Sequence, residues 1–221
     1  MVPSEFRFPT EDALEMAPPR KHDTDAILDA ARSLVLRDGP RAASVAAIAA
    51  ASGAPVGTLY HRFGNRNGVL VATWMRALER FQARALAAAE HPDPLEAAVG
   101  MAVSTIDFAR ALPEDAKLLL QLRPRDLLDG EPESDLRQRL EQMNAPLFGH
   151  IQRLTRDLFH STAPRDLDRV ANAVVDLPNA TLRRHARQGE LPAWLEADVA
   201  ESARILLCHR PSPGTDGPGS D

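Results

Sequence analysis

Apolar residues recur at three- and four-residue spacing along most of the chain, and no segment alternates apolar and polar residues as a half-buried strand would. The pattern predicts an all-α protein whose helices begin or end at prolines, glycines and capping residues. The expected helices run from Thr24 to Gly39, from Ser44 to Gly53, from Pro55 towards Arg66, over 66–89, 95–112 and 113–122, from Ser134 to Leu158, from Pro164 to Pro178, and from Pro192 to Leu206.

Residues 46–66 hold two short helical segments that follow each other across a glycine. Ile48 belongs to the inward face of the first segment, Gly53 can take the left-handed conformation that ends it, and Leu59 belongs to the inward face of the second. Two packed helices joined by a three- or four-residue turn with a glycine form a helix-turn-helix, whose second helix enters the major groove of DNA. The pattern therefore favours DNA binding.

The sequence GAPVGTLYHRF, followed by GNRNGVL, resembles the DNA-binding segment of the TetR family of regulators over about residues 24–75. The positions of the family pattern are filled by Gly53, Gly57, Thr58, Leu59, Tyr60, Phe63 and Arg66. Three residues depart from it: Pro55 stands where Ser is frequent, Arg66 where Lys is usual, and Ala43 where Thr is frequent. Proline suits the first turn of a helix and arginine keeps the positive charge, so the expected fold is unaffected.

The resemblance implies DNA contacts from the second helix of the motif and its flanks. The candidate residues are Ser44, Pro55, Val56, Gly57, Thr58, Tyr60, His61 and Arg66. Tyr60 and Arg66 suit phosphate oxygens, whereas the start of the helix offers mainly backbone and methyl groups, so DNA shape should carry more of the recognition than base contacts. Ser44 can cap its helix or bond a phosphate, and the two roles are compatible.

Charge is distributed in a way that agrees with this interpretation. The whole chain has a net charge of −5, but residues 20–66 alone carry +3. An acidic body behind a basic head would orient the molecule on DNA. Arg20 and Lys21, just before the first helix, either contact DNA or are simply solvated.

Composition shifts divide the chain into four parts: a flexible arm at 1–21, the DNA-binding domain at 22–66, a regulatory and dimerisation domain at 67–210, and a disordered Pro/Gly-rich tail at 211–221. The start of the chain does not resemble a signal peptide and no stretch approaches eighteen apolar residues, so we expect a cytoplasmic protein without membrane contact. The single cysteine, Cys208, is expected to be a buried small side chain rather than a redox sensor.

For the second domain, the resemblance implies an effector site, and we expect an apolar pocket between the fourth, fifth, seventh and eighth helices. Its candidate lining residues are Trp74, Met101, Phe108, Met143, Phe148 and Asn179. Asn144 and Asn179 lie near Pro146 and Pro178, where a bend frees backbone carbonyls. Few charges fall on these faces, which favours a small hydrophobic or aromatic effector. A fully packed core without a ligand is the alternative, because such residues are common in helical interiors.

The resemblance also implies a homodimer formed by the last two helices. Their apolar residues Leu167, Val170, Val174, Leu195, Val199 and Leu206 are the candidates for the interface. Such a dimer would place two recognition helices on a palindromic operator.

Residue patterns typical of catalysis or metal binding do not stand out. None of the seven histidines is paired at the spacing of a metal site, and no phosphate-binding loop, nucleophile elbow or carboxylate pair is visible. We therefore expect neither an enzyme nor a metal or cofactor.

The sequence thus predicts a DNA-binding transcriptional regulator, a homodimeric repressor released from its operator by a small hydrophobic effector. A helix-turn-helix adaptor that grips another protein is the alternative. Thr58, Tyr60, His61 and Arg66 favour DNA, since that mixture suits phosphates. The effector, the operator and the choice between repression and activation stay open.

Overall fold

The computed structural model describes residues 24–123 and 133–209, and this part of the chain is built of helices without a strand. The all-α prediction is therefore confirmed. The helices are α1 (Thr24–Asp38), α2 (Val45–Ser52), α3 (Val56–Phe63), α4 (Arg66–Ala88), α5 (Pro94–Ala111), α6 (Pro113–Gln121), α7 (Glu133–Phe159), α8 (Pro164–Ala171), α9 (Leu177–Gln188) and α10 (Leu195–Cys208). The predicted arm with Arg20 and Lys21, the loop at 124–132 and the tail lie outside the described residues.

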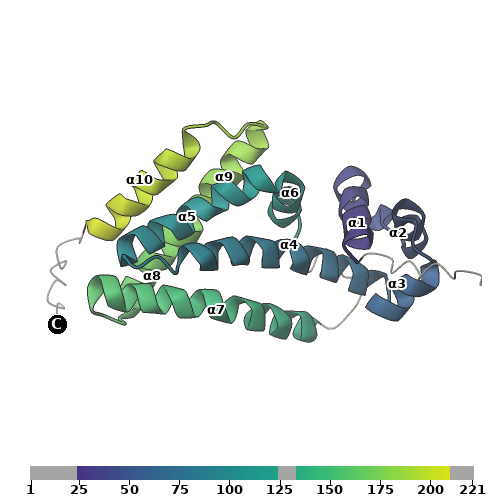
Figure 1. Ribbon diagram of the computed structural model, residues 1–221, viewed down its shortest axis with the longest axis horizontal. Helices are drawn as coiled ribbons and strands as arrows, with labels where there is room; N and C mark the ends of the chain where they lie inside the picture. The colour runs from purple at the N-terminus through teal and green to yellow at the C-terminus, as the bar shows by residue number, and fades with distance from the viewer. Residues whose placement is uncertain (1–23, 124–132, 210–221) are drawn as a thin grey trace, which may run out of the picture.

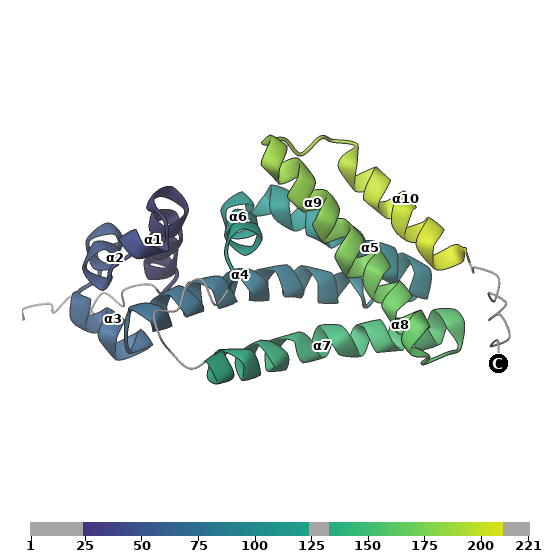
Figure 2. The ribbon, with the colours of Figure 1, turned by 180° about the vertical axis from the view of Figure 1, so that it is seen from behind.

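The molecule consists of a small head and a larger body that share the long helix α4 (Figure 1). The head, α1 to α3, lies at one end, and α4 runs from it through the length of the body. Helix α7 flanks α4 on one side, while α5, α9 and α10 lie on the other (Figures 1 and 2). No helix within the described ranges has both the length and the apolar character needed to span a membrane.

Local signals fix the short helices of the head. The Ser44 hydroxyl accepts a hydrogen bond from the amide of Ala47 (3.1 Å) and caps α2, and Gly53, at φ 70°, ends it. The Asn65 side chain caps α4 by accepting from the amide of Gly68 (2.8 Å). A Cβ on Gly68 would lie 1.9 Å from the carbonyl oxygen of Phe63, so no other residue fits without moving the backbone. The turn between α3 and α4 is therefore tightly specified.

The core of the head extends into the body. Its buried cluster contains residues of α1 to α4, among them Ile27, Ile48, Leu59 and Leu70, but also Leu118 from α6. Helix α6 is thus packed into the head although it follows α5 in the chain. The boundary predicted at residue 66 is crossed by a shared apolar core.

The segment predicted as one helix from Pro164 to Pro178 is divided. A π-helical turn over Asn172–Asp176 separates α8 from α9, two residues before Pro178. Proline has no N–H for the preceding turn, and a wider turn is one way to accommodate this. The Asn179 side chain donates to the carbonyl of Val175 (2.8 Å), one of the groups in this turn. The helical backbone continues through Pro178 to Gln188, so the helix does not end at the proline. Pro178 is instead accommodated by the π-helical turn, and Asn179 bonds one of its carbonyls.

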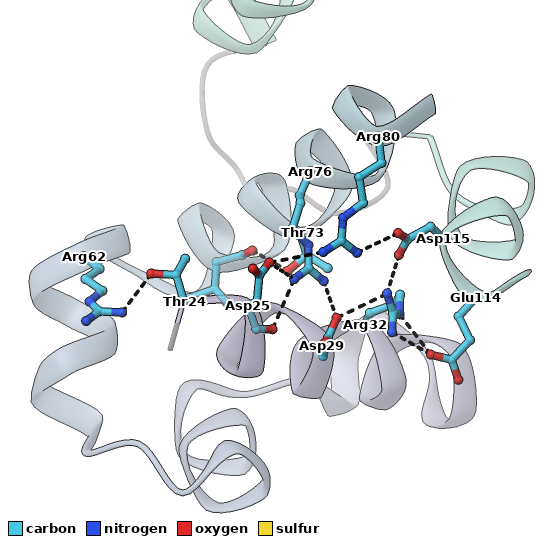
Figure 3. A network of polar contacts seen from close by, with 11 residues as sticks. Thr24, Asp25, Asp29, Arg32, Arg62, Thr73, Arg76, Arg80, Glu114 and Asp115 are labelled. Atoms are coloured by element: carbon cyan, nitrogen blue, oxygen red, sulfur yellow. Dashed lines mark hydrogen bonds and ion pairs between the residues drawn. The ribbon is translucent and has the colours of Figure 1, made fainter. Parts of the chain in front are cut away.

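Charged side chains join α1, α4 and α6 in one network (Figure 3). Its centre is Asp115 of α6, only 1% exposed, which pairs with Arg32 of α1 and, at 3.0 Å, with Arg80 of α4. Arg32 also pairs with Glu114 (2.7 Å). Burial alone would lower the pKa of Arg32, but its hydrogen bond and attraction to Asp115 and the neighbouring acids raise it. Asp115 therefore ties the head to the body through two arginines.

A second pair of carboxylates strengthens the contact between α1 and α4. Arg76 of α4 is buried and pairs with Asp25 and Asp29 of α1, both at 2.6 Å. The hydrogen bond from Arg76 lowers the pKa of Asp25, burial opposes this, and the charges of Arg76 and Arg80 lower the pKa further. These carboxylates keep α1 against the first half of α4.

Replacing Asp115 by alanine should destabilise the protein by about 3 kcal/mol, because it breaks a buried ion pair. This value is at the low end for such pairs, since Arg32 and Arg80 keep other acidic neighbours. Chemical denaturation followed by circular dichroism measures this. Asp38→Ala is the matched control, since the Arg37–Asp38 pair is exposed and its loss should leave stability unchanged. Equal effects of the two changes would contradict the central role of Asp115.

Stability should also depend on pH through Asp25. A carboxyl whose pKa is lowered in the folded state stabilises the fold above its ordinary pKa of 3.8, and this contribution is lost as the pH falls through the lower folded value. The stability gap between wild type and Asp25→Asn should therefore shrink between about pH 6 and about pH 3. The same gap at both pH values would show that the charge of Asp25 contributes nothing.

Candidate nucleic-acid interface and effector region

Helix α3 buries one residue and exposes most of the others. Leu59 is 1% exposed and packs in the core of the head, whereas Tyr60 is 53% exposed. The other predicted DNA contacts at Pro55, Val56, Gly57 and His61 are also exposed, and Thr58 is half-buried. The structure thus gathers these residues on one outward surface of the head.

Ser44 is exposed at the start of α2, with its hydroxyl already used as the cap. A hydroxyl that accepts a bond from an amide keeps its own hydrogen for a second partner. The capping role is shown, and a phosphate contact stays a prediction.

Gly57 has no structural reason within the chain to be glycine. A Cβ there would meet nothing within 4 Å, and the residue lies in the first turn of α3. Glycine in a helix is unfavourable relative to alanine by about 0.5–1 kcal/mol. A glycine at position 57 is understandable if another molecule approaches the backbone closely there. Gly68 differs, because the fold of the protein itself requires a glycine at that position.

Arg66 has a different position from the one expected for a phosphate contact. Its guanidinium donates to the carbonyl of Ala43 (3.1 Å) and to the carbonyl of Pro40. It also donates to the Asn67 side chain (3.3 Å). In this structure Arg66 therefore joins the start of α4 to the segment before α2, and the phosphate contact stays a prediction.

Residues 27–73 match the family model described as "Bacterial regulatory proteins, tetR family". The matched range covers α2, α3 and most of α1, together with the first part of α4. The chain therefore carries the DNA-binding segment of the TetR family over these residues. One curated relative is the HTH-type transcriptional repressor ComR of Escherichia coli (strain K12), 39% identical over 66 residues. That match covers 30% of this chain and 31% of ComR, so it concerns less than a third of the relative.

Solved structures share the fold over nearly the whole described chain. The regulator FadR from Bacillus subtilis, in complex with stearoyl-CoA, has a TM-score of 0.66 at 15% identity, covering 84% of this chain and 98% of that one. FadR from Bacillus halodurans gives 0.64 at 18%, covering 83% and 94%. A TetR-family regulator from Shewanella sp. PV-4 gives 0.62 at 22%, covering 83% and 95%. The body therefore has the TetR fold as well as the head.

TetR proteins are transcription regulators and not enzymes, in agreement with the prediction. Within residues 24–123 and 133–209, His, Cys, Asp and Glu do not form a group of three that could hold a metal ion.

The residues predicted to line an effector pocket are dispersed in the TetR body. Met101 and Phe108 are buried in two different core clusters, and Phe108 packs edge-on against Phe81 at 5.5 Å between ring centroids. The Trp74 indole donates to the carbonyl of Leu122 at the end of α6 (3.2 Å). Phe148 is 62% exposed. The structure therefore does not bring these four side chains together.

The two remaining candidates lie at the surface of the body. Met143 is half-buried on α7, and its neighbour Asn144 accepts a hydrogen bond from the buried Gln82 of α4 (2.8 Å). Asn179 lies at a hollow on α9 of about 590 Å³, together with Arg183 and Arg187. Asn179 thus lines a hollow on α9, whereas Met101 and Phe108 are buried in core clusters.

Four of the six residues predicted for the dimer interface are buried within the chain itself. Val170, Val174, Leu195 and Val199 are at most 3% exposed and belong to the core of the body. These four side chains pack inside the chain itself and are not exposed to a partner, and the dimer interface stays a prediction. Leu167 and Leu206 are half-buried, and the exposed large residues of this region are Trp194 and Ile205. Cys208, expected to be buried, is exposed.

A groove between α5, α6 and α9 was not predicted. It has a volume of about 830 Å³, an apolar floor that includes Leu119, Leu120 and Leu182, and basic residues at its edge. Periodicity does not reveal it, because these leucines follow the same helical spacing as core residues. The available signal was Lys117 and Arg183, charged residues that lie next to leucines in the sequence.

Replacing Arg66 by alanine removes two hydrogen bonds to carbonyls and should destabilise the protein by about 2 kcal/mol. The melting temperature measures this, with Arg41→Ala, an exposed arginine of the same segment, as the control that leaves it unchanged. The salt dependence of DNA binding separates the two roles. A slope reduced by about one, with stability intact, would instead assign Arg66 to a phosphate.

Proposed function

We propose that the protein is a homodimeric transcriptional repressor that binds a palindromic DNA operator through α3 and leaves it when a small effector binds the body. The observation that carries this is the outward surface of α3, where Leu59 anchors the helix and Tyr60, His61 and the backbone around Gly57 stand free of the core. The description of ComR as a repressor supports the direction of regulation. The predicted cytoplasmic location rests on this proposal, because a regulator must reach its operator.

The chemistry of this surface suits the DNA backbone more than base edges. A phenol and an imidazole donate hydrogen bonds to phosphate oxygens, and backbone amides at the start of a helix do the same. Pro55 and Val56 offer apolar contact, such as to a thymine methyl group. We infer that two such surfaces recognise an operator largely through its shape.

Sequencing the DNA that the full-length protein retains from fragmented genomic DNA tests the DNA-binding function. A palindromic site with half-sites about one helical turn apart, or a multiple of it, is the expected result. Retention of no DNA, at low salt and with a folded protein, would reject the proposal and favour the adaptor alternative.

Replacing Gly57 by alanine should stabilise the head and weaken operator binding together. The helix gains about 0.5–1 kcal/mol, because nothing obstructs the new methyl group within the chain. A methyl group between the backbone and a phosphate should reduce affinity for the selected operator. Denaturation and fluorescence anisotropy measure the two quantities, and unchanged affinity would remove Gly57 from the interface.

The proposed dimer is formed by the outer face of α10 and the residue before it; α10 lies on the opposite side of the body from α7 (Figure 2). Ile205, 56% exposed, and Trp194, 53% exposed, are its apolar anchors. They take the place of the four predicted residues that are buried within the chain, Val170, Val174, Leu195 and Val199. Half-buried Leu206 packs against the core of the body and contributes at the edge of this face.

Replacing Ile205 by glutamate should convert the dimer to a monomer, since a charge would be buried opposite its own copy across a two-fold axis. Sedimentation measures this, and operator binding should fall with it. Phe148→Glu on the exposed face of α7 is the matched control and should stay dimeric. A wild-type protein that sediments as a monomer at micromolar concentration would contradict the interface.

The effector is proposed to be mainly hydrophobic. The fold is that of FadR from Bacillus subtilis, whose structure holds stearoyl-CoA. The body can hold the two heads at a spacing that fits the operator or at one that does not. An effector that binds the second form more tightly by 1–3 kcal/mol would lower operator affinity by about five- to 150-fold. Release of operator DNA by hydrophobic metabolites, with a raised melting temperature, is the test.

A further inference from the structure

The groove between α5, α6 and α9 combines an apolar floor with positive charges from two helices. Leu119 and Leu120 of α6 and Leu182 of α9 line the apolar part, and Leu182 is buried. Its volume of about 830 Å³ lies within the range of about 300–1,000 Å³ that is usual for small-molecule sites. The groove is therefore large enough for an organic ligand.

Cationic residues outnumber acidic ones around this groove. Lys117 of α6 and both Arg183 and Arg187 of α9 are exposed at its edge, and Glu190 is the acidic residue among those that line it. Arg110 also lines the groove, but it is engaged with Glu196 and with the carbonyl of Pro192 (2.8 Å). Positive charges from separate helices that face one space favour a negatively charged group there.

We propose that this groove is the effector site and that it takes an amphipathic anion, a molecule with an apolar tail and a carboxylate or phosphate head group. The tail lies on the leucines, and Lys117 and Arg187 hold the head group from opposite helices. The site rests on the proposed function, which it makes specific. It differs from the helical interior around Met101 and Phe108, which the protein's own side chains fill.

Helix α6 connects this groove to the head. Ala116, Leu119 and Leu120 line the groove, whereas Leu118 is packed in the core of the head. Asp115, on the same short helix, holds Arg32 of α1 and Arg80 of α4. A ligand that displaces α6 therefore acts on the head through Leu118 and through the ion pairs of Glu114 and Asp115 with Arg32.

Fluorescence of cis-parinarate, a long-chain polyene carboxylate, tests the site on the full-length dimer. We expect binding, displacement by laurate, and little displacement by dodecanol, which has the same tail without the charge. Dodecyl phosphate distinguishes the head groups: stronger competition than by laurate would assign a phosphate, and weaker competition a carboxylate.

Two kinds of variant locate the ligand. Lys117→Ala combined with Arg187→Ala removes the proposed head-group contacts and should weaken binding about tenfold or more. Ala186→Trp keeps every charge but fills the groove from the exposed side of α9 and should abolish binding. Arg156→Ala, an exposed arginine on α7, is the matched control and should bind as wild type does. Sedimentation and circular dichroism confirm that each variant is a folded dimer.

The outcomes separate this inference from the proposed function. Operator binding without ligand should be the same in all these variants. A wild-type protein that binds no operator DNA would reject the proposed function itself. Two further outcomes apply if operator binding is intact. Parinarate binding that neither variant reduces would show that the ligand does not bind in this groove. Equal competition by dodecanol and laurate would show that the site does not require a charged head group. Absence of parinarate binding to the wild type would overturn the site.

Discussion

The arrangement of head and body depends on a carboxylate that is taken out of water. Asp115 is almost completely buried, and such a charge is tolerated only where opposite charges surround it. The arginines that meet it come from α1 and α4, so the ion pairs form only when three separate segments are in place. Leu118 adds an apolar contact from the same helix. A helix of nine residues thereby determines how the head is held.

The exposed surface of α3, which we propose contacts DNA, has few side chains that can form hydrogen bonds. Val56 and Gly57 give the start of α3 little hydrogen-bonding capacity, and Thr58 is half-buried. The head therefore offers shape, backbone amides and a few donors at the end of the helix. In the proposed dimer, such specificity would depend on the deformability of the DNA and on the spacing between the two heads more than on individual base contacts. Regulation through spacing would then be effective, because small changes in geometry would affect most of the recognition at once.

Helices and their ends could be predicted well from the sequence because their signals are local. Gly53 ends α2 and Ser44 caps it, as the pattern indicated. Pro178 was expected to kink or split its helix, but a π-helical turn before it lets the helix continue. Which apolar face meets which neighbour is not local information. Val170 and Val199 have the same helical spacing whether they face another copy or their own core, and the structure places them in the core. The partners of Arg66 and the groove beside α6 are tertiary properties of the same kind, and only the charges of Lys117 and Arg183 gave a sign of the groove.

Helix α4 has 23 residues and is therefore about 34 Å long. Arg76 and Arg80 fasten its first half to α1 and α6, and Leu70 and Ala77 lie in the same core as Leu118. A hinge between the head and α4 would have to break all of these contacts. In the proposed regulator, the unit that moves would consequently be larger than the DNA-binding domain and would include α6 and the near half of α4. A tilt of this unit by a few degrees would be magnified along α4 into a displacement of α3.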